Sequence, residues 1–199
     1  TKELIAAVLS SHFKTYTTQG NLNNHIGVPL TLLSIQADAQ MAVIEMGANH
    51  LNEIGSYCQY AMPNYGMITN CGKAHLEGFG GIEGVKIGKS ELYKHISSSK
   101  GKIFINGDDD VLLELSNNLE KIYYGASEEF NVHGKSYSNS EFVEFKWNVK
   151  NQSVDNQLLV NTNMFGQYNF INLLCAVCIG NYFAVSKNDI NDALANYIP

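Results

Sequence analysis

Up to about residue 125 the chain alternates short apolar runs with longer helical patterns, and this alternation constrains the fold most. The strand-like runs are "FKTYTT", "MAVIEMG", "YGMITN", "KIFIN" and "KIYYG". The helical segments are "TKELIAAVLSSH", "VPLTLLSIQA", "LNEIGSYCQYA", "IEGVKIGKSELYKHI" and "DDVLLELSNNL". Parallel strands need long crossovers, usually helices, and strands buried on both faces are apolar throughout. Residues 1–127 are therefore predicted to form an α/β core with a mostly parallel sheet flanked by helices.

The pattern changes between residues 128 and 165. The segments "FVEFKWNV" and "NQLLVNTNMFG" alternate polar and apolar residues, as half-exposed antiparallel strands do. We expect a small antiparallel sheet attached to the main one. Two closing helices are predicted in 166–199, from "NFINLLCAVCIGNYF" and "KNDINDALANY". Because a doubly wound domain normally opens with a strand, and this chain opens in a helix at Thr1, we expect one domain of a longer protein.

Composition narrows the class of protein. No apolar run in the 199 residues has the length of a membrane span, and no secretory signal is recognisable. The net charge of -6 and the pI near 5.4 argue against a general nucleic-acid binder. Cys175 and Cys178 form a CxxC without the second pair that a zinc site needs, so we expect buried, reduced thiols. Four cysteines without a disulfide framework suit a cytoplasmic protein.

Polar residues follow four of the predicted strands, in "TTQGNLNN", "EMGANH", "TNCGKAH" and "NGDDD". Ligands of open parallel sheets bind outside the carboxyl ends of the strands, so these segments predict a polar site along one edge. Ordinary turn chemistry is the alternative, since Gly, Asn and Asp are common in turns.

Two of these segments carry candidate metal ligands. Glu45 ends an apolar strand, where a carboxylate suits Mg²⁺, although a solvated strand-end charge remains the alternative. His75 lies in the glycine-rich "GKAHLEGFGG". A lone loop histidine is more often a surface or hydrogen-bonded residue than a ligand, but the nearby glycines let the backbone approach a ligand closely. A phosphate-binding loop of the Walker type is not present, because Gly84 and Gly88 of "GVKIGKS" enclose three residues instead of four.

Longer segments resemble a known family. "TTQGNLNNHIGVPLTLL", "AVIEMGANH", "GMITNCGKAHLEGFGGIEGV", "GKSELY" and "FGQYNFINLLCAV" together make the chain similar to the central ATP-binding domain of Mur ligases, over nearly all its length. The resemblance implies a P-loop-like fold within a three-domain protein. Residues 1–199 would then be the central ATPase domain, lacking its first strand and P-loop, with the N-terminal UDP-sugar domain and the C-terminal domain absent.

Such ligases phosphorylate a carboxylate with ATP and let an amine attack the acyl phosphate, which needs Mg²⁺ and positioned donors. By resemblance, Glu45 matches a magnesium-binding glutamate and His75 a ligand of a second magnesium. Lys89 matches a lysine that CO₂ converts to a carbamate, an anionic oxygen ligand. Without the resemblance, Lys89 would be read as a solvated helix lysine. Gly88 departs from the family, which usually has alanine there.

The asparagines match the family as well. Asn169 and Asn172 fall on a "YNxxN" pattern, of which Asn172 is expected to face adenine. Helix capping is the alternative, more so for Asn169. Asn21, Asn23 and Asn24 match a turn near the phosphates and the nucleotide-linked substrate. Asn52 is a second departure, at a position where the family usually has glycine.

Within the family, "NLNNHIGVPLTLL" and "HLEGFGG" favour the member that adds D-alanyl-D-alanine to UDP-N-acetylmuramoyl-tripeptide during peptidoglycan precursor synthesis. The alternatives are another Mur ligase, a folylpolyglutamate synthase-like ligase, or a nucleotide-binding module without catalysis. We expect no nucleic-acid partner and no membrane insertion. The missing domains would be needed for turnover, so this chain alone is expected to be inactive.

Overall fold

The computed structural model describes residues 1–72, 76–137, 141–152 and 158–199. Its first half contains α1 (Lys2–Ser10), β1 (Thr15–Thr17), α2 (Gly27–Ser34), β2 (Met41–Val43), α3 (Glu53–Ala61), β3 (Tyr65–Gly66), α4 (Leu76–Phe79) and α5 (Ile82–Ser98). The second half contains β4 (Lys102–Asn106), α6 (Asp110–Leu115), β5 (Glu120–Gly125), β6 (Val132–Tyr137), β7 (Phe142–Val149), β8 (Val160–Phe165), a 3₁₀ turn (Gln167–Asn169), α7 (Phe170–Tyr182) and α8 (Lys187–Asn196). The predicted alternation of strands and helices is confirmed.

The strands form two sheets in the described residues. β1 and β2 pair in parallel, and a six-stranded sheet has the order β3-β4-β5-β6-β7-β8. Its pairs from β3 to β6 are parallel, and those from β6 to β8 are antiparallel. The antiparallel strands are attached to the parallel ones, as predicted, and they continue the same sheet. The attachment is made by β6, a strand that the sequence pattern did not predict.

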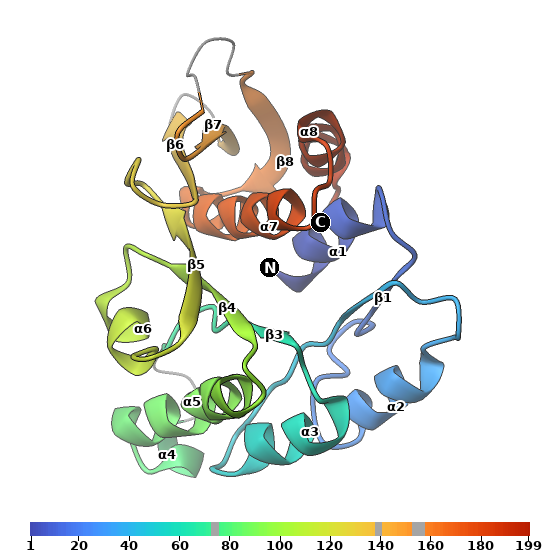
Figure 1. Ribbon diagram of the computed structural model, residues 1–199, viewed down its shortest axis with the longest axis vertical. Helices are drawn as coiled ribbons and strands as arrows, with labels where there is room; N and C mark the ends of the chain where they lie inside the picture. Colours follow the sequence, from blue (N-terminus) through green and yellow to red (C-terminus); the bar gives the residue numbers. More distant parts are fainter. Residues whose placement is uncertain (73–75, 138–140, 153–157) are drawn as a thin grey trace.

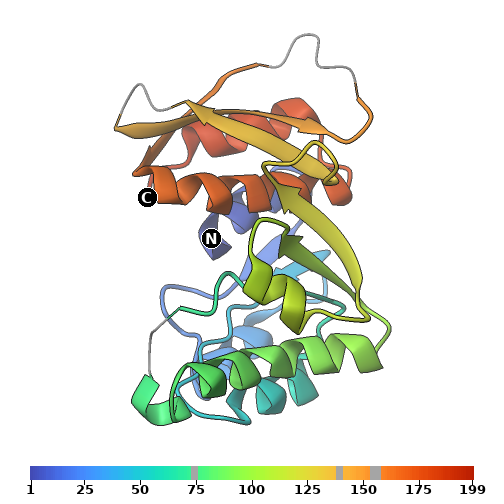
Figure 2. The ribbon, with the colours of Figure 1, turned by 90° about the vertical axis from the view of Figure 1, so that its left-hand side faces the viewer.

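Helices cover both faces of the six-stranded sheet (Figures 1 and 2). α7 packs across β4, β5 and β6 on one face, with α1 and α8 beside it. α5 and α6 pack against β4 on the other face, and α3 lies against α5. No helix in the described part of the chain is both long and apolar enough to span a membrane.

Strand β4 shows why the centre of the sheet is apolar. Successive side chains of a strand point to opposite faces. Phe104 packs in the cluster that contains α7, whereas Ile103 and Ile105 pack in the cluster that contains α5 residues. A strand covered by helices on both sides therefore needs a continuous apolar run, which "KIFIN" supplies.

Helix α7 has the longest run of buried residues in the described part of the chain. Its residues 173–180 are all buried, including Cys175 and Cys178. All four cysteines are free. Burial raises the pKa of the Cys175 thiol to about 12 and that of Cys178 well above its ordinary value. The expectation that Cys175 and Cys178 are buried thiols in the core is confirmed.

Candidate functional site

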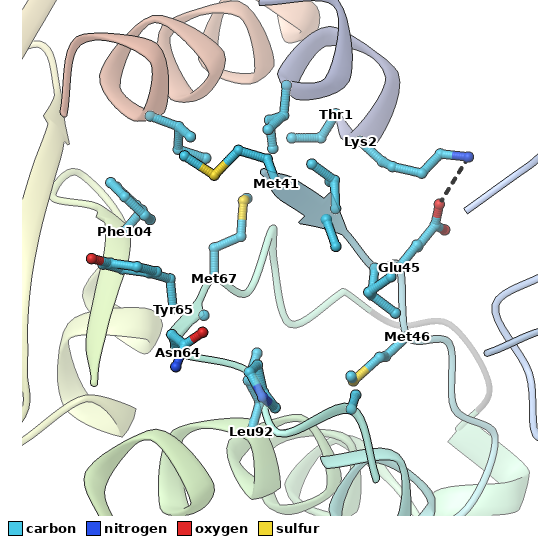
Figure 3. Close-up of a pocket in the computed structure, with 18 of the residues that line it drawn as sticks. Thr1, Lys2, Met41, Glu45, Met46, Asn64, Tyr65, Met67, Leu92 and Phe104 are labelled. Carbon is cyan, nitrogen blue, oxygen red and sulfur yellow. Dashed lines mark ion pairs between the residues drawn. The ribbon is translucent and has the colours of Figure 1, made fainter. Parts of the chain in front are cut away.

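A cavity of about 810 Å³ lies between the two sheets. Residues 41–46, which include β2, line one side, and residues 63–69, which include β3, line the other. Figure 3 shows Glu45 and Lys2 beside each other in this cavity, with Tyr65, Met67 and Phe104 further along it. The cavity also contacts Lys89 of α5. Polar groups from three separate segments thus face one space.

Glu45 lies two residues beyond the end of β2. Its backbone N–H donates to the Oγ1 of the buried Thr18, at 2.9 Å, which ends the strand pairing. Its Oε1 accepts a hydrogen bond from Asn23 Nδ2 at 2.9 Å, and its Oε2 lies 3.8 Å from Lys2 Nζ. The side chain is 40% exposed, so the carboxylate is oriented by partners and still reachable from the cavity.

Lys2 is a site residue that sequence reasoning missed. Its side chain is only 9% exposed, and Nζ donates to the carbonyl oxygens of Thr18 at 2.6 Å and Gly20 at 2.9 Å. Nζ also pairs with Glu3 at 2.8 Å. A cation in the first turn of a helix opposes the helix dipole, so its place at the start of α1 was the available signal of a specific partner.

Lys89 reaches the cavity from α5. Its Nζ donates to the carbonyl oxygen of Asn70 at 2.5 Å, just beyond β3. Burial lowers the pKa of the Lys89 ammonium, and the nearby Cys71 opposes that effect. The half-buried Lys89 is therefore not the fully solvated helix lysine of the alternative interpretation.

The predicted metal set is only partly described. His75 lies outside the described residues, and the described ones contain no group of three His, Cys, Asp or Glu side chains placed to hold a metal. Glu45 fits the chemistry of Mg²⁺ nonetheless, because it is an oriented carboxylate facing a cavity, and Mg²⁺ prefers oxygen ligands.

The three asparagines of the turn differ in their contacts. Asn23 contacts Glu45 and accepts the Gly47 N–H on its own carbonyl oxygen at 2.7 Å. Asn24 Oδ1 accepts the N–H groups of Ile26 and Gly27, where α2 begins. Asn21 is exposed. Of the three, Asn23 is the one that the structure ties to Glu45.

The pair at the start of α7 connects to α1. Asn172 Oδ1 accepts a hydrogen bond from Thr1 Oγ1 at 2.6 Å, and Asn172 Nδ2 donates to Asn169 Oδ1 at 3.0 Å. Asn169 is buried and donates to the carbonyl oxygen of Phe165 at 2.9 Å, so its side chain ties α7 to β8 instead of capping the helix. Asn172 thus lies next to the first turn of α1, because its partner Thr1 directly precedes Lys2 in the chain.

Both departures from the family pattern have a structural reason. A Cβ on Gly88 would meet Phe79 Cε1 at 2.5 Å, so glycine admits the phenylalanine ring against α5. Asn52 has φ 68°, a left-handed conformation that glycine and asparagine adopt most readily.

Comparison with known proteins adds a family profile and full-length relatives. The profile "Mur ligase middle domain" matches residues 1–180. The UDP-N-acetylmuramoyl-tripeptide--D-alanyl-D-alanine ligase of Bacillus subtilis is 30% identical over 195 residues, which make up 98% of this chain and 41% of that protein. The protein of the same name in Escherichia coli is 33% identical over 204 residues, covering 98% of this chain and 43% of that protein. The chain therefore spans less than half the length of these relatives.

Solved structures agree on the fold. A crystal structure of MurF from Acinetobacter baumannii superimposes with a TM-score of 0.85 at 30% identity, covering 100% of this chain and 43% of that one. MurF ligase from Thermotoga maritima, in complex with ADP, has a TM-score of 0.81 at 23% identity and is covered to 45%. The second likeness concerns the fold alone.

Proposed function

This chain belongs to the Mur ligase family, and from that premise we propose that it is the nucleotide-binding part of an ATP-dependent ligase of peptidoglycan precursor synthesis. The proposed substrates are UDP-N-acetylmuramoyl-tripeptide and D-alanyl-D-alanine, as the names of the relatives indicate. ATP is the nucleotide that the resemblance to the Mur ligase family implies, and it is part of this proposal.

One observation carries the proposal: the oriented carboxylate of Glu45, beyond the end of β2, and the amine of Lys89, on α5, face a single cavity. In the proposed reaction, a carboxylate oxygen of the tripeptide attacks the γ-phosphorus of ATP, giving an acyl phosphate and ADP. The amine of D-alanyl-D-alanine then attacks the acyl carbon, phosphate leaves, and an amide bond remains.

The residues of this chain act by placing charge around that reaction. Glu45, His75 and a carbamylated Lys89 are proposed to hold Mg²⁺, which would neutralise the phosphate charge when bound. Lys2 and Asn23 orient the Glu45 carboxylate. Carbamylation joins the neutral Lys89 amine to CO₂ and releases a proton. Asn172 and Asn169 are proposed to lie near adenine, and Asn21, Asn23 and Asn24 near the nucleotide-linked substrate.

The cavity supports the proposal that a strand preceding Thr1 completes the core. β2 and β3 do not pair in the described residues, and the cavity separates them. A strand placed between them and followed by a loop would lead into α1, whose first turn lies beside Glu45. The N–H groups at a helix N-terminus favour phosphate, so such a loop would hold the phosphates of ATP there.

The remaining parts of the proposal concern the whole protein. We place the UDP-sugar site and the amine site on further domains, and we expect the 199 residues alone to fold without turning over. A cytoplasmic location is proposed as well, which the four free cysteines support.

The test uses the full-length protein. Phosphate release from ATP is measured with UDP-N-acetylmuramoyl-tripeptide and D-alanyl-D-alanine, together and separately, for the wild type and Glu45→Ala. We expect release to need both substrates and to fall at least about a hundredfold in the variant. Release with L-glutamate and a folate instead would identify the protein as a folylpolyglutamate synthase-like ligase. Absence of release with any acceptor would leave a nucleotide-binding module without catalysis.

A further inference from the structure

Glu91 joins α5, the helix that carries Lys89, to the start of α3, the helix that follows the segment carrying Glu45. Its Oε1 accepts the backbone N–H of Asn52 at 2.6 Å, and its Oε2 accepts that of Gly55 at 2.8 Å. Both N–H groups belong to the start of α3, whereas Glu91 belongs to α5. A carboxylate at the positive end of a helix, accepting two N–H groups, makes strong charge-assisted contacts.

The contact matters because the two sheets are not hydrogen-bonded to each other in the described residues. Glu45 follows β2 of the first sheet, and the segment after it leads directly into α3. Lys89 lies on α5, which covers β3 and β4 of the second sheet. The spacing between Glu45 and Lys89 therefore depends on how α3 is fixed to α5.

We propose that Glu91 is a positioning residue, which sets the separation between the segment carrying Glu45 and the helix carrying Lys89. The proposal rests on the proposed function, because it assigns Glu91 to the magnesium and nucleotide site of that reaction. Glu91 acts through Asn52 and Gly55 and touches neither substrate nor nucleotide.

The local geometry is built around this carboxylate. A Cβ on Gly55 would lie 3.3 Å from Glu91 Oε2, which is tighter than an ordinary contact, so glycine leaves room for the carboxylate. Asn52, with φ 68°, holds the left-handed turn whose N–H donates to Glu91. Substituting either side of the contact should thus change the spacing of the two helices.

Glu53 offers a matched control. Its Oε2 accepts the N–H groups of Asn49 at 2.7 Å and His50 at 3.1 Å, in the same turn before α3. These are the same kind of bond, made by a glutamate of α3 itself, so they do not connect α3 to α5. Glu53→Gln therefore perturbs the turn, and Glu91→Gln perturbs both the turn and the connection.

The experiment compares Glu91→Gln, Glu53→Gln and the wild type in the full-length protein. Three quantities are measured: amide exchange over 49–56, the rise in unfolding temperature caused by Mg²⁺ with ADP, and the Mg²⁺ concentration for half-maximal phosphate release. For Glu91→Gln we expect faster exchange at Asn52 and Gly55. We also expect a smaller rise in unfolding temperature, which corresponds to about tenfold weaker Mg²⁺–ADP binding. The Mg²⁺ concentration for half-maximal phosphate release should rise about tenfold. Glu53→Gln should keep both magnesium readouts within about twofold of the wild type.

Gly55→Ala guards against a variant that does not fold. Alanine favours the helix, so its stability should hold, while its Cβ displaces the Glu91 carboxylate and raises the Mg²⁺ requirement in the same direction. If Glu91→Gln and Gly55→Ala both keep the wild-type magnesium readouts, Glu91 is only a helix cap and the proposal is overturned. If the wild type itself shows no Mg²⁺-dependent nucleotide binding or phosphate release, the proposed function fails first, and this proposal fails with it.

Discussion

Replacing Gly88 with alanine tests the packing that holds α4 against the helix bearing Lys89. The new Cβ would lie 2.5 Å from Phe79 Cε1 and 3.1 Å from Cδ1. Carbon atoms in contact are about 3.5–4.0 Å apart, so the ring must retreat by about 1 Å. The Phe79 side chain is only 6% exposed, and its ring has little free space to occupy.

Two opposing effects decide the magnitude. Overpacking a filled core costs about 1–3 kcal/mol, and alanine in place of glycine inside a helix gains about 1 kcal/mol. We therefore expect Gly88→Ala to lower the free energy of unfolding by about 1 kcal/mol. Urea unfolding of the chain measures it, followed by fluorescence of Trp147, the only tryptophan and a buried one.

A second substitution identifies the cause. In a Phe79→Leu background the ring is absent, so Gly88→Ala should stabilise the chain by the helix gain alone, about 1 kcal/mol. Gly84→Ala is the contrasting variant, since its Cβ would meet the backbone oxygen of Phe79, which no side-chain change relieves. Stabilisation by Gly88→Ala in the wild-type background would refute the reasoning.

Three further predictions concern Lys2, the buried thiols and Glu53. Lys2→Met should lower the free energy of unfolding by about 2 kcal/mol in urea titrations, because two carbonyl oxygens lose a charged donor; no change would contradict its role. Cys175 and Cys178 should resist a thiol reagent at pH 8 in the native state and react in urea, since burial raises both pKa values. Burial raises the pKa of Glu53, but the N–H groups of Asn49 and His50 together with the His50 imidazole outweigh it and lower the pKa overall. Any stability advantage of the wild type over Glu53→Gln should be complete at neutral pH and disappear as pH falls through that lowered pKa; an advantage independent of pH would argue against it.

The parallel part of the sheet was predictable because burial on both faces leaves a local sequence signal. The predicted strand "KIFIN" has the bounds of β4, Lys102–Asn106. By contrast, "MAVIEMG" was predicted as a strand to Gly47, and β2 ends at Val43. The N–H of Glu45 turns to the Thr18 hydroxyl, a partner 27 residues away, which no local pattern reveals.

Strand β6 was missed for a similar reason. Its sequence, "VHGKSY", has neither a continuous apolar run nor clear alternation. It is a strand because β5 and β7 pair with its two edges, and such pairing depends on tertiary structure.

Part of the site was predictable from position alone. Glu45 follows a predicted strand, where ligands of such sheets bind, and it does lie in a cavity. The role of Lys2 required the fold, because its partners lie 16 and 18 residues further along the chain. The same holds for Asn169, whose bond to the Phe165 carbonyl takes the place of the helix cap that its sequence position suggested.

The most direct test of the acyl-phosphate reaction is an isotope transfer by the full-length protein. The terminal carboxylate of the tripeptide substrate is labelled with ¹⁸O, and the phosphate released in the presence of ATP and D-alanyl-D-alanine is analysed by mass spectrometry. Our account predicts one ¹⁸O atom in each phosphate released, because the labelled oxygen bridges carbon and phosphorus before the amine displaces it. Unlabelled phosphate formed together with the amide product would contradict the proposed ligase reaction.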